Sequence, residues 1–531
     1  MRTPLQRYLS FVAALGFASI AGSTFAQGRP VVPGNDARAV RDRVRAYRVA
    51  HEGAIVRELA ALLAIPNIAR DSANIRRNAD TLVAMLRGRG VEARTLESPG
   101  GAPAVYGELR TPGATRTLVL YAHYDGQPVD TTQWASPPWR PTLRDGPLEE
   151  GGRVVEMPAA GSAPGSAFGP EWRLYARSAS DDKAPIVAML AALDALRDAR
   201  LRPTVNLKFF LEGEEEAGSP HLRDMLTRHA ALLAADAWIF CDGPVHQSRK
   251  MQVVFGVRGT MDLEITTYGP GRALHSGHYG NWAPNPGALM ANLLASLRDD
   301  DGRILIPGFY DDVRPLAAAE RRALDNVPDS DGELRRSLAL GGTEATDARL
   351  LERLNLPALN IRGIQMGQVG AQASNTINTR ARASIDFRLV PDETPARIRE
   401  LVEAHVRARG YHIVHDEPNA DTLRAHRRVA RLDWGDGYPG VRADMELPIS
   451  RAVVRLLDAA AGTPVIRVPT LGGSLPIYVF QEVLRTPLVI VPIVNHDNNQ
   501  HAANENLRMQ NLWDGIETIA VLVAGLGPAW R

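Results

Sequence analysis

The chain has 531 residues, of which 45% are hydrophobic and 23% charged, a composition that excludes a disordered or fibrous protein and allows sizeable cores. Its 61 basic and 60 acidic residues leave a net charge of +1, which provides no overall positive field for binding nucleic acid. Cys241 is the single cysteine, so an internal disulfide and metal sites built from several thiolates are excluded as well.

The N-terminal segment is typical of a cleavable export signal. Basic residues precede an apolar run over residues 9–21, and small residues lead to Ala26, after which we expect cleavage of a signal peptide of residues 1–26. The alternative is a membrane anchor, but the run is shorter than the ~20 residues of a spanning helix. We expect no later segment to be long and apolar enough to span a membrane. The mature protein should then be periplasmic or secreted.

Helical and strand patterns alternate through the next part of the chain. Strands separated by helices predict an α/β domain, in which helices cover both faces of a mainly parallel sheet and active groups gather at the carboxyl ends of the strands. The predicted helices are residues 37–65, 75–89 and 184–196, and the predicted strands are residues 117–122, 172–176, 205–211 and 237–241.

A different pattern follows and predicts an inserted domain. Residues 251–267 and 381–389 alternate hydrophobic and polar side chains, as half-exposed antiparallel strands do, and helical patterns lie between and after them. We therefore place an inserted α+β lid or dimerisation domain at residues 258–418. The first domain takes residues 27–257 and 419–531, beginning again with the charged, turn-rich stretch 416–446.

Polar residues that can bind a metal or take part in catalysis follow several predicted strands. His123 and Asp125 share one side of a strand end, so Asp125 can orient a metal-binding His123, although such a pair is also common on surfaces. Asp181 would emerge at the same edge after the strand at residues 172–176. For its neighbour Asp182 we favour an ordinary helix N-cap.

The strongest local signal is the run of carboxylates from Glu212 to Glu216. Four acids within five residues, with no basic residue among them, are either solvated or neutralised by a cation. Asp242 is a further acid after a strand, and His501 follows the last predicted strand, at residues 488–494, with His496 as a competing histidine. Strand ends that deliver two histidines and several carboxylates suit a site for two divalent cations.

The order and context of these residues resemble the dinuclear zinc peptidase family of carnosinases, bacterial dipeptidases, glutamate carboxypeptidases and acetylornithine deacetylases. The resemblance runs from about residue 50 to the C-terminus. It is carried by His123-x-Asp125, Ser180-Asp181-Asp182-Lys183, Glu215-Glu216-Ala217-Gly218-Ser219, Asp242, Leu274-His275-Ser276-Gly277, Asn375, Arg388, Gly472-Gly473-Ser474-Leu475-Pro476 and His501.

The resemblance implies a role for each residue of the site. It implies that one metal is bound by His123 and Asp242, the other by Glu216 and His501, and that Asp181 bridges both. Glu215 would be the general base, Asp125 would orient His123, and His275 of the inserted domain would stabilise the oxyanion, often across a homodimer. Asn375, Arg388, Gly473 and Ser474 would hold the substrate. Ala184-Pro185 and Asn378-Thr379 depart from the usual family pattern on the substrate side.

The expected activity is hydrolysis of an amide bond in a small substrate by a metal-activated water. A dipeptidase or carboxypeptidase is the first interpretation, and an N-acyl amino acid deacylase uses the same groups. A metal-binding protein without catalysis would need Glu215 or a ligand replaced, and none is. The resemblance implies two zinc ions, although carboxylate-rich sites with one histidine per ion also accept manganese or cobalt.

Overall fold

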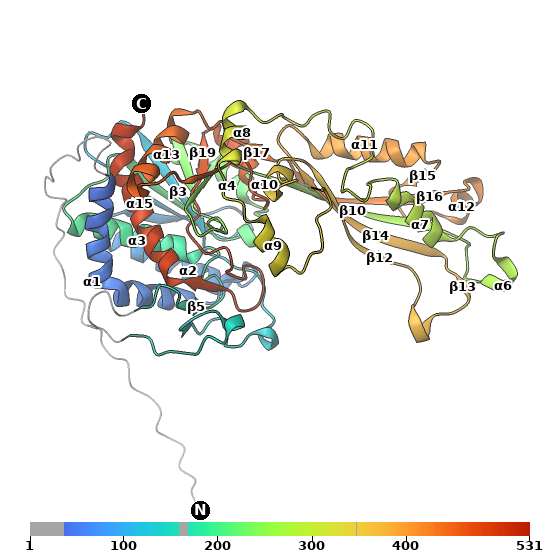
Figure 1. Cartoon of the computed structure of the whole chain (residues 1–531), viewed down its shortest axis with the longest axis horizontal. Helices are drawn as coiled ribbons and strands as arrows, with labels where there is room; N and C mark the ends of the chain where they lie inside the picture. The colour runs from blue at the N-terminus through green and yellow to red at the C-terminus, as the bar shows by residue number, and fades with distance from the viewer. Residues whose placement is uncertain (1–36, 159–167, 347) are drawn as a thin grey trace, which may run out of the picture.

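The computed structural model describes residues 37–158, 168–346 and 348–531. The predicted signal peptide lies outside these residues. The described chain forms two domains, with the inserted domain extending to one side of the first (Figure 1).

The first domain is built on an eight-stranded sheet, which confirms the predicted α/β class. Its strands β6, β3, β7 and β19 are parallel neighbours, while β1 and β2 add an antiparallel edge. In spatial order the strands are β1 (Glu92–Leu96), β2 (Ala104–Leu109), β6 (Asn206–Glu212), β3 (Thr117–His123), β7 (Ala237–Phe240), β19 (Leu488–Ile490), β8 (Gln252–Val254) and β18 (Ile466–Val468).

Helices cover both faces of this sheet, so its central strands are apolar on both sides. One core contains residues of α1 (Ala37–Leu63), α2 (Ser72–Arg87), α3 (Lys183–Asp198), α13 (Pro448–Ala461) and α15 (Met509–Ala529). The other core lies under α4 (Leu222–Arg228), α5 (Ala230–Leu233) and α14 (Ile477–Leu484).

The C-terminal helix α15 (Met509–Ala529) corrects the expectation that no segment after the signal peptide is long and apolar enough to span a membrane. By length and composition, α15 could cross a membrane, with a mean hydropathy of 1.3 over its most apolar window. Two thirds of that window, 67%, is buried, because α15 packs between α1, α3 and α13. Its apolar residues therefore belong to the core of the first domain.

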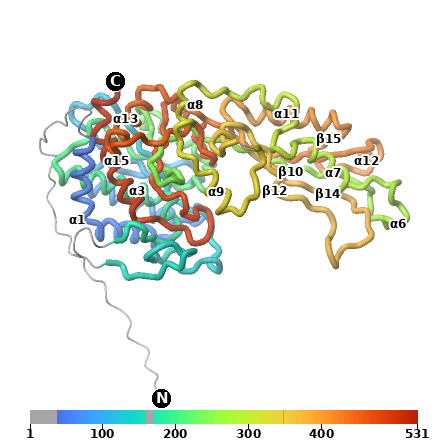
Figure 2. The backbone as a smooth tube through the Cα atoms, viewed as in Figure 1, coloured from blue at the N-terminus to red at the C-terminus, as the bar shows by residue number. Residues whose placement is uncertain are grey.

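The inserted domain is a five-stranded sheet with helices on one face. The strands lie in the order β12 (Ala358–Gln365), β14 (Arg380–Leu389), β10 (Gly259–Tyr268), β16 (Val429–Tyr438) and β15 (His412–Val414). Helices α7 (Pro286–Ala295) and α11 (Pro395–Ala408) contribute to its core. The tube in Figure 2 follows the chain out along β10 and back along β16.

Two details of the predicted organisation were wrong. Strand β16 belongs to the inserted sheet, so the boundary after residue 418 cuts that domain short; its polar residues Arg431 and Asp433 made a strand with one uncovered face look like a loop. The strand β5 (Arg173–Tyr175) lies outside the main sheet. It pairs with β4 (Thr142–Arg144) and β20 (Asn506–Arg508) in a small sheet of its own.

Candidate metal centre

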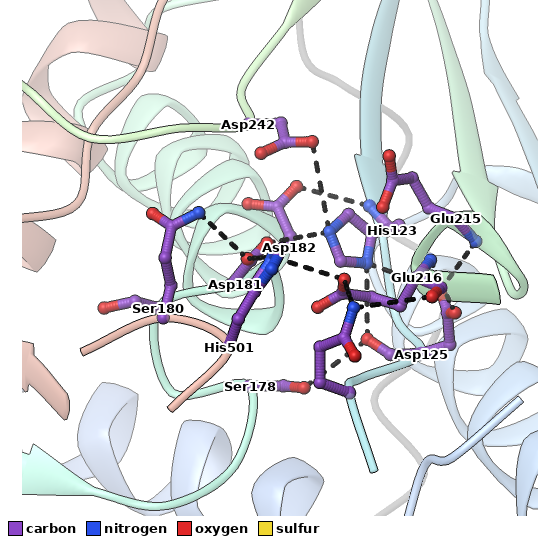
Figure 3. Close-up of polar contacts among 12 residues, drawn as sticks. His123, Asp125, Ser178, Ser180, Asp181, Asp182, Glu215, Glu216, Asp242 and His501 are labelled. Carbon is purple, nitrogen blue, oxygen red and sulfur yellow. Dashed lines mark hydrogen bonds and ion pairs between the residues drawn. The ribbon is translucent and has the colours of Figure 1, made fainter. Parts of the chain in front are cut away.

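The carboxyl ends of the parallel strands bring the predicted ligands together, as Figure 3 shows. His123 ends β3, Asp242 follows β7, and Glu215 and Glu216 form a short turn after β6. Asp181 comes from the loop before α3, and His501 from the loop between β19 and β20. We call these six residues the cluster.

The carboxylate of Asp181 lies between the two histidines. Its Oδ1 is 2.8 Å from Nε2 of His123, and its Oδ2 is 3.2 Å from Nε2 of His501. Each histidine has another carboxylate nearby. Asp242 Oδ2 is 3.9 Å from His123 Nε2, and Glu216 Oε2 is 3.3 Å from His501 Nε2. The cluster therefore divides into two halves that share Asp181.

Asp125 lies behind His123 and is completely buried. Its carboxylate is 3.4 Å from Nδ1 of His123, and it accepts hydrogen bonds from the backbone N–H groups of Glu215 and Glu216 at 3.1 and 3.0 Å. One carboxylate thus fixes the imidazole ring and the acidic turn together, which leaves Nε2 of His123 directed into the cluster.

Asp182 does more than begin a helix. It occupies the N-cap position of α3, but its side chain makes no capping bond and instead accepts from the backbone N–H of His123 at 3.2 Å. A second group that could hold a metal combines His123, Asp182 and Asp242, in addition to the group of His123, Asp181 and Glu216. The preferred N-cap interpretation of Asp182 was therefore incomplete.

The electrostatics of the cluster favour a bound cation. Burial and the charge of Asp181 raise the pKa of Asp242 to about 7 and that of Glu216 to about 8. Burial also raises the pKa of Glu215 well above its ordinary value, with Asp242 adding to the shift. Among the described residues, Asp242 Oδ2 is buried without a hydrogen-bond partner. The two imidazoles offset only part of this negative charge, and divalent ions would supply more positive charge.

Around the histidines, the pKa shifts favour the charged forms of the side chains. Hydrogen bonding to Asp181 raises the pKa of His501 to about 9. Although burial opposes it, hydrogen bonding to His123 and His501 holds the pKa of Asp181 below its usual range. These shifts favour positive charge on the imidazoles beside Asp181, in keeping with a site that would hold cations.

Two of the predicted substrate groups meet where the two domains join. Arg388, near the end of β14, donates from Nη1 to Oγ of Ser474 at 2.9 Å and from Nε to Asp386 at 3.2 Å. Gly473 lies in the same turn as Ser474, and its carbonyl accepts from the backbone N–H of Arg258 at 3.1 Å.

The remaining predicted substrate group, Asn375, and the predicted oxyanion donor, His275, lie at the far end of the inserted domain. His275 and Asn375 are both exposed and belong to the paired ends of β11 (Leu274–His275) and β13 (Thr376–Ile377), where Ser276 N–H donates to the Asn375 carbonyl at 2.9 Å. Helix α6 (Ser276–Tyr279), which follows His275 directly, is remote from the first domain in Figure 1. The single chain does not bring His275 to the cluster.

Several residues that support the cluster were not predicted from the sequence. Glu505 is buried and pairs with Arg177 at 2.9 Å. Gln127 donates to Glu216 at 2.7 Å, and Gln500 to Asp181 at 3.3 Å. The position of Glu505 close to His501 was the only available signal. His496, the competing histidine, is only half-buried and lies beside Asp497.

Comparison with known proteins gives a consistent result. The profile of Peptidase family M20/M25/M40 matches residues 119–524. The Cys-Gly metallodipeptidase of Schizosaccharomyces pombe is 25% identical over 427 residues, covering 79% of this chain and 82% of the relative. The human Beta-Ala-His dipeptidase is 26% identical over 431 residues, covering 79% of this chain and 76% of the relative.

Solved structures share the two-domain fold. An M20 family metallo-carboxypeptidase from Sulfolobus solfataricus superposes with a TM-score of 0.71 at 27% identity, covering 89% of this chain and 99% of the other. Human carnosine dipeptidase 1 gives a TM-score of 0.70 at 23% identity, covering 93% and 99%. The residues that the family profile matches, 119–524, include every member of the cluster.

Proposed function

The chain belongs to Peptidase family M20/M25/M40, and on that premise we propose that it is a dinuclear metallodipeptidase that hydrolyses the amide bond of short peptides. Its similarity to a Cys-Gly metallodipeptidase and to a Beta-Ala-His dipeptidase supports dipeptides as the substrate class.

The observation that carries this proposal is the position of Asp181 between His123 and His501, at 2.8 and 3.2 Å. A carboxylate with one oxygen toward each imidazole can bridge two cations, and each half of the cluster offers one further carboxylate. We assign Asp242 to the half with His123 and Glu216 to the half with His501. Two divalent ions held there would polarise the amide carbonyl and lower the pKa of water.

Glu215 is the residue best suited to move protons. It is the member of the cluster that this assignment leaves without a metal, and it adjoins Glu216 in the same turn. Its carboxylate can take a proton from the attacking water and deliver it to the leaving amine. Asp125 supports this role because it anchors the backbone of the turn and the ring of His123.

A second copy of the chain would complete the site. His275 and Asn375 lie at the end of the inserted domain that is remote from the cluster of their own chain, yet the family resemblance implies that His275 stabilises the oxyanion and that Asn375 holds the substrate. The inserted domain also exposes Trp282, Ile364 and Val369, with 80%, 62% and 86% of their surfaces accessible. A homodimer that covers these apolar side chains would bring His275 of one chain toward the substrate of the other.

We further propose export, on the sequence of residues 1–26 alone, with removal of the signal peptide. N-terminal sequencing of the protein recovered from the periplasm or medium, expected to begin at Gln27, tests this separately from the activity.

The proposed activity is tested by a panel of dipeptides, longer peptides and N-acyl amino acids, each with and without a chelator. We expect release of amino acids from dipeptides, its loss with chelator, and its return when zinc, manganese or cobalt is added. Hydrolysis of N-acyl amino acids alone would instead establish a deacylase. No hydrolysis of any substrate by metal-loaded protein would contradict both.

A further inference from the structure

Three residues of the inserted sheet form a row that faces the first domain. Thr260 of β10 lies directly opposite Arg388 of β14 on one side and Tyr438 of β16 on the other. Directly opposed residues share a face of a sheet, so Arg388 and Tyr438 project together. The neighbouring Met261 and Phe387 point to the opposite face, into the core of the inserted domain.

This row meets residues of the turn and helix that follow β18. Arg388 bonds to Ser474, and the ring of Tyr438 stacks on that of Tyr478 in α14, with centroids 5.3 Å apart and planes inclined by 9°. Both tyrosines are only half-buried. Tyr438 thus leaves part of its aromatic surface exposed next to Arg388, while the guanidinium of Arg223 lies over the ring of Tyr478 at 5.8 Å from its centroid.

The turn that carries Gly473 and Ser474 lies close to Asp242 of the cluster, since a Cβ atom at Gly243 would lie 3.6 Å from Leu471, which leads into that turn. Burial, and then the negative charge of Glu215, raises the pKa of Tyr438 to about 12, while Arg388 opposes the shift. Tyr438 is thus within electrostatic reach of both the general base and the guanidinium. A substrate whose carboxylate is bound by Arg388 would then lie next to Tyr438, because both residues lie directly opposite Thr260 in the sheet.

Arg258 adds a second guanidinium at this junction. Its backbone and Nε bind the carbonyls of Gly473 and Gly472, both at 3.1 Å. Within the described part of the chain, its terminal nitrogens have no hydrogen-bond partner. Burial and the charge of Arg388 lower the pKa of Arg258 to about 10, and only Asp386 opposes them. Two guanidiniums with one carboxylate leave a net positive site for an anion.

We propose that Arg258 shares the C-terminal carboxylate of the substrate with Arg388, and that Tyr438 and Tyr478 contact the side chain of the C-terminal residue. The enzyme then favours dipeptides that end in an aromatic residue or histidine over those that end in glycine. This inference rests on the proposed dipeptidase function and names the substrates within it.

The aromatic contact is tested with Ala-Phe, Ala-His and Ala-Gly, which differ only in the C-terminal side chain. For the metal-loaded wild type we expect kcat/KM for Ala-Phe to exceed that for Ala-Gly about 10-fold or more. Tyr478→Leu and Tyr438→Leu should each reduce this ratio, and Tyr478→Phe should restore it because the ring is retained. Tyr47→Leu, which removes a half-buried tyrosine of α1, is the matched control and should leave the ratio unchanged.

The outcomes separate the two levels of the proposal. Equal kcat/KM for Ala-Phe and Ala-Gly in the wild type, or an equal loss for both in the tyrosine variants, would overturn the aromatic contact alone. A wild type that hydrolyses no dipeptide would overturn the proposed function and this inference together. Melting temperatures of the variants show whether they fold. Where a variant does not fold, the ratio of kcat/KM for Ala-Phe to that for Ala-Gly in the wild type still tests the aromatic contact.

Arg258 is tested by removing the carboxylate from the substrate. We expect Arg258→Gln to raise KM for Ala-Phe about 10-fold or more with a smaller change in kcat, since a charge-assisted hydrogen bond is lost. The effect should be absent with Ala-Phe amide, which has no carboxylate. Arg43→Gln, at an exposed position of α1, is the control. An equal rise of KM for Ala-Phe amide would show that Arg258 only supports the turn at Gly472 and Gly473.

Discussion

The carboxylate of Glu505 accepts a hydrogen bond from the backbone N–H of Asp181 at 2.9 Å. The same carboxylate accepts from the N–H groups of Ser180 and Ser178 at 3.0 and 2.9 Å and pairs with Arg177. Glu505 follows His501 in the same loop. It therefore ties the loop of the bridging carboxylate to the loop of a histidine ligand.

Glu505→Gln should weaken metal binding without removing a ligand. The amide of glutamine has one oxygen that can accept a hydrogen bond, whereas both oxygens of Glu505 accept. Some of the backbone N–H groups around Glu505 would therefore lose their acceptor, and Asp181 would move. We expect metal affinity to fall about 10- to 100-fold, measured by competition with a chelator. Glu482→Gln on the surface of α14 is the control, and an unchanged affinity in Glu505→Gln would remove this positioning role.

Asp181→Ala should lose both metals and activity. Two cations a few Å apart repel each other strongly unless a negative charge lies between them. Elemental analysis of the purified variant measures the loss directly. Asp80→Ala, at an exposed position of α2, should keep the wild-type content. Full metal occupancy in Asp181→Ala would contradict the bridging assignment.

Glu215→Gln should retain both metals and lose turnover. The variant removes the base but none of the five proposed ligands, so we expect kcat to fall about 10²- to 10⁴-fold. Activity and metal content are measured on the same preparation, with Glu150→Gln at an exposed site as the control. Near-native kcat would exclude Glu215 as the base.

His275→Ala should lower kcat about 10²-fold or more with unchanged metal content, because an oxyanion donor acts mainly in the transition state. His278→Ala is the matched control, since its ring lies 4.7 Å from that of His275 and is equally exposed.

Mixing His275→Ala with Glu215→Gln then tests the homodimer. Mixed dimers would contain one intact composite site and regain part of the activity, provided that tagged chains show subunit exchange. No recovery despite exchange would place the action of His275 within its own chain.

Glu393→Gln should flatten the pH dependence of stability. Glu393 is fully buried in the inserted domain, and burial, together with the charge of Asp312, raises its pKa from 4.5 to about 8. Between these values the folded protein holds a proton that the unfolded chain releases, so stability falls as pH rises.

The measurement is the melting temperature from about pH 5 to about pH 8, the interval set by this shift. The decline should be smaller in Glu393→Gln than in the wild type. Glu400→Gln, at an exposed position of α11, should behave like the wild type. Parallel curves for wild type and Glu393→Gln would show that Glu393 does not titrate in this range.

The sequence by itself determined the class of the first domain and the members of the cluster. Apolar runs such as residues 117–122 and 205–211 could only be buried strands, and residues directly after parallel strands must meet at one edge of the sheet. His123, Asp242 and the acidic run from Glu212 to Glu216 follow from that rule, whereas the choice of Glu216 as a ligand and of Glu215 as the base came from the family resemblance. Their order also carried the family resemblance, which the profile match confirms.

Only the tertiary structure decided how distant segments meet. Strand β16 was missed because one face of the inserted sheet is uncovered, so its charged residues gave no apolar signal. The hydrogen bond from the backbone N–H of Asp181 to Glu505 and the stack of Tyr438 on Tyr478 join residues far apart in the chain. Local periodicity reports burial along one element, whereas such contacts depend on how separate elements pack, which no single segment of sequence records.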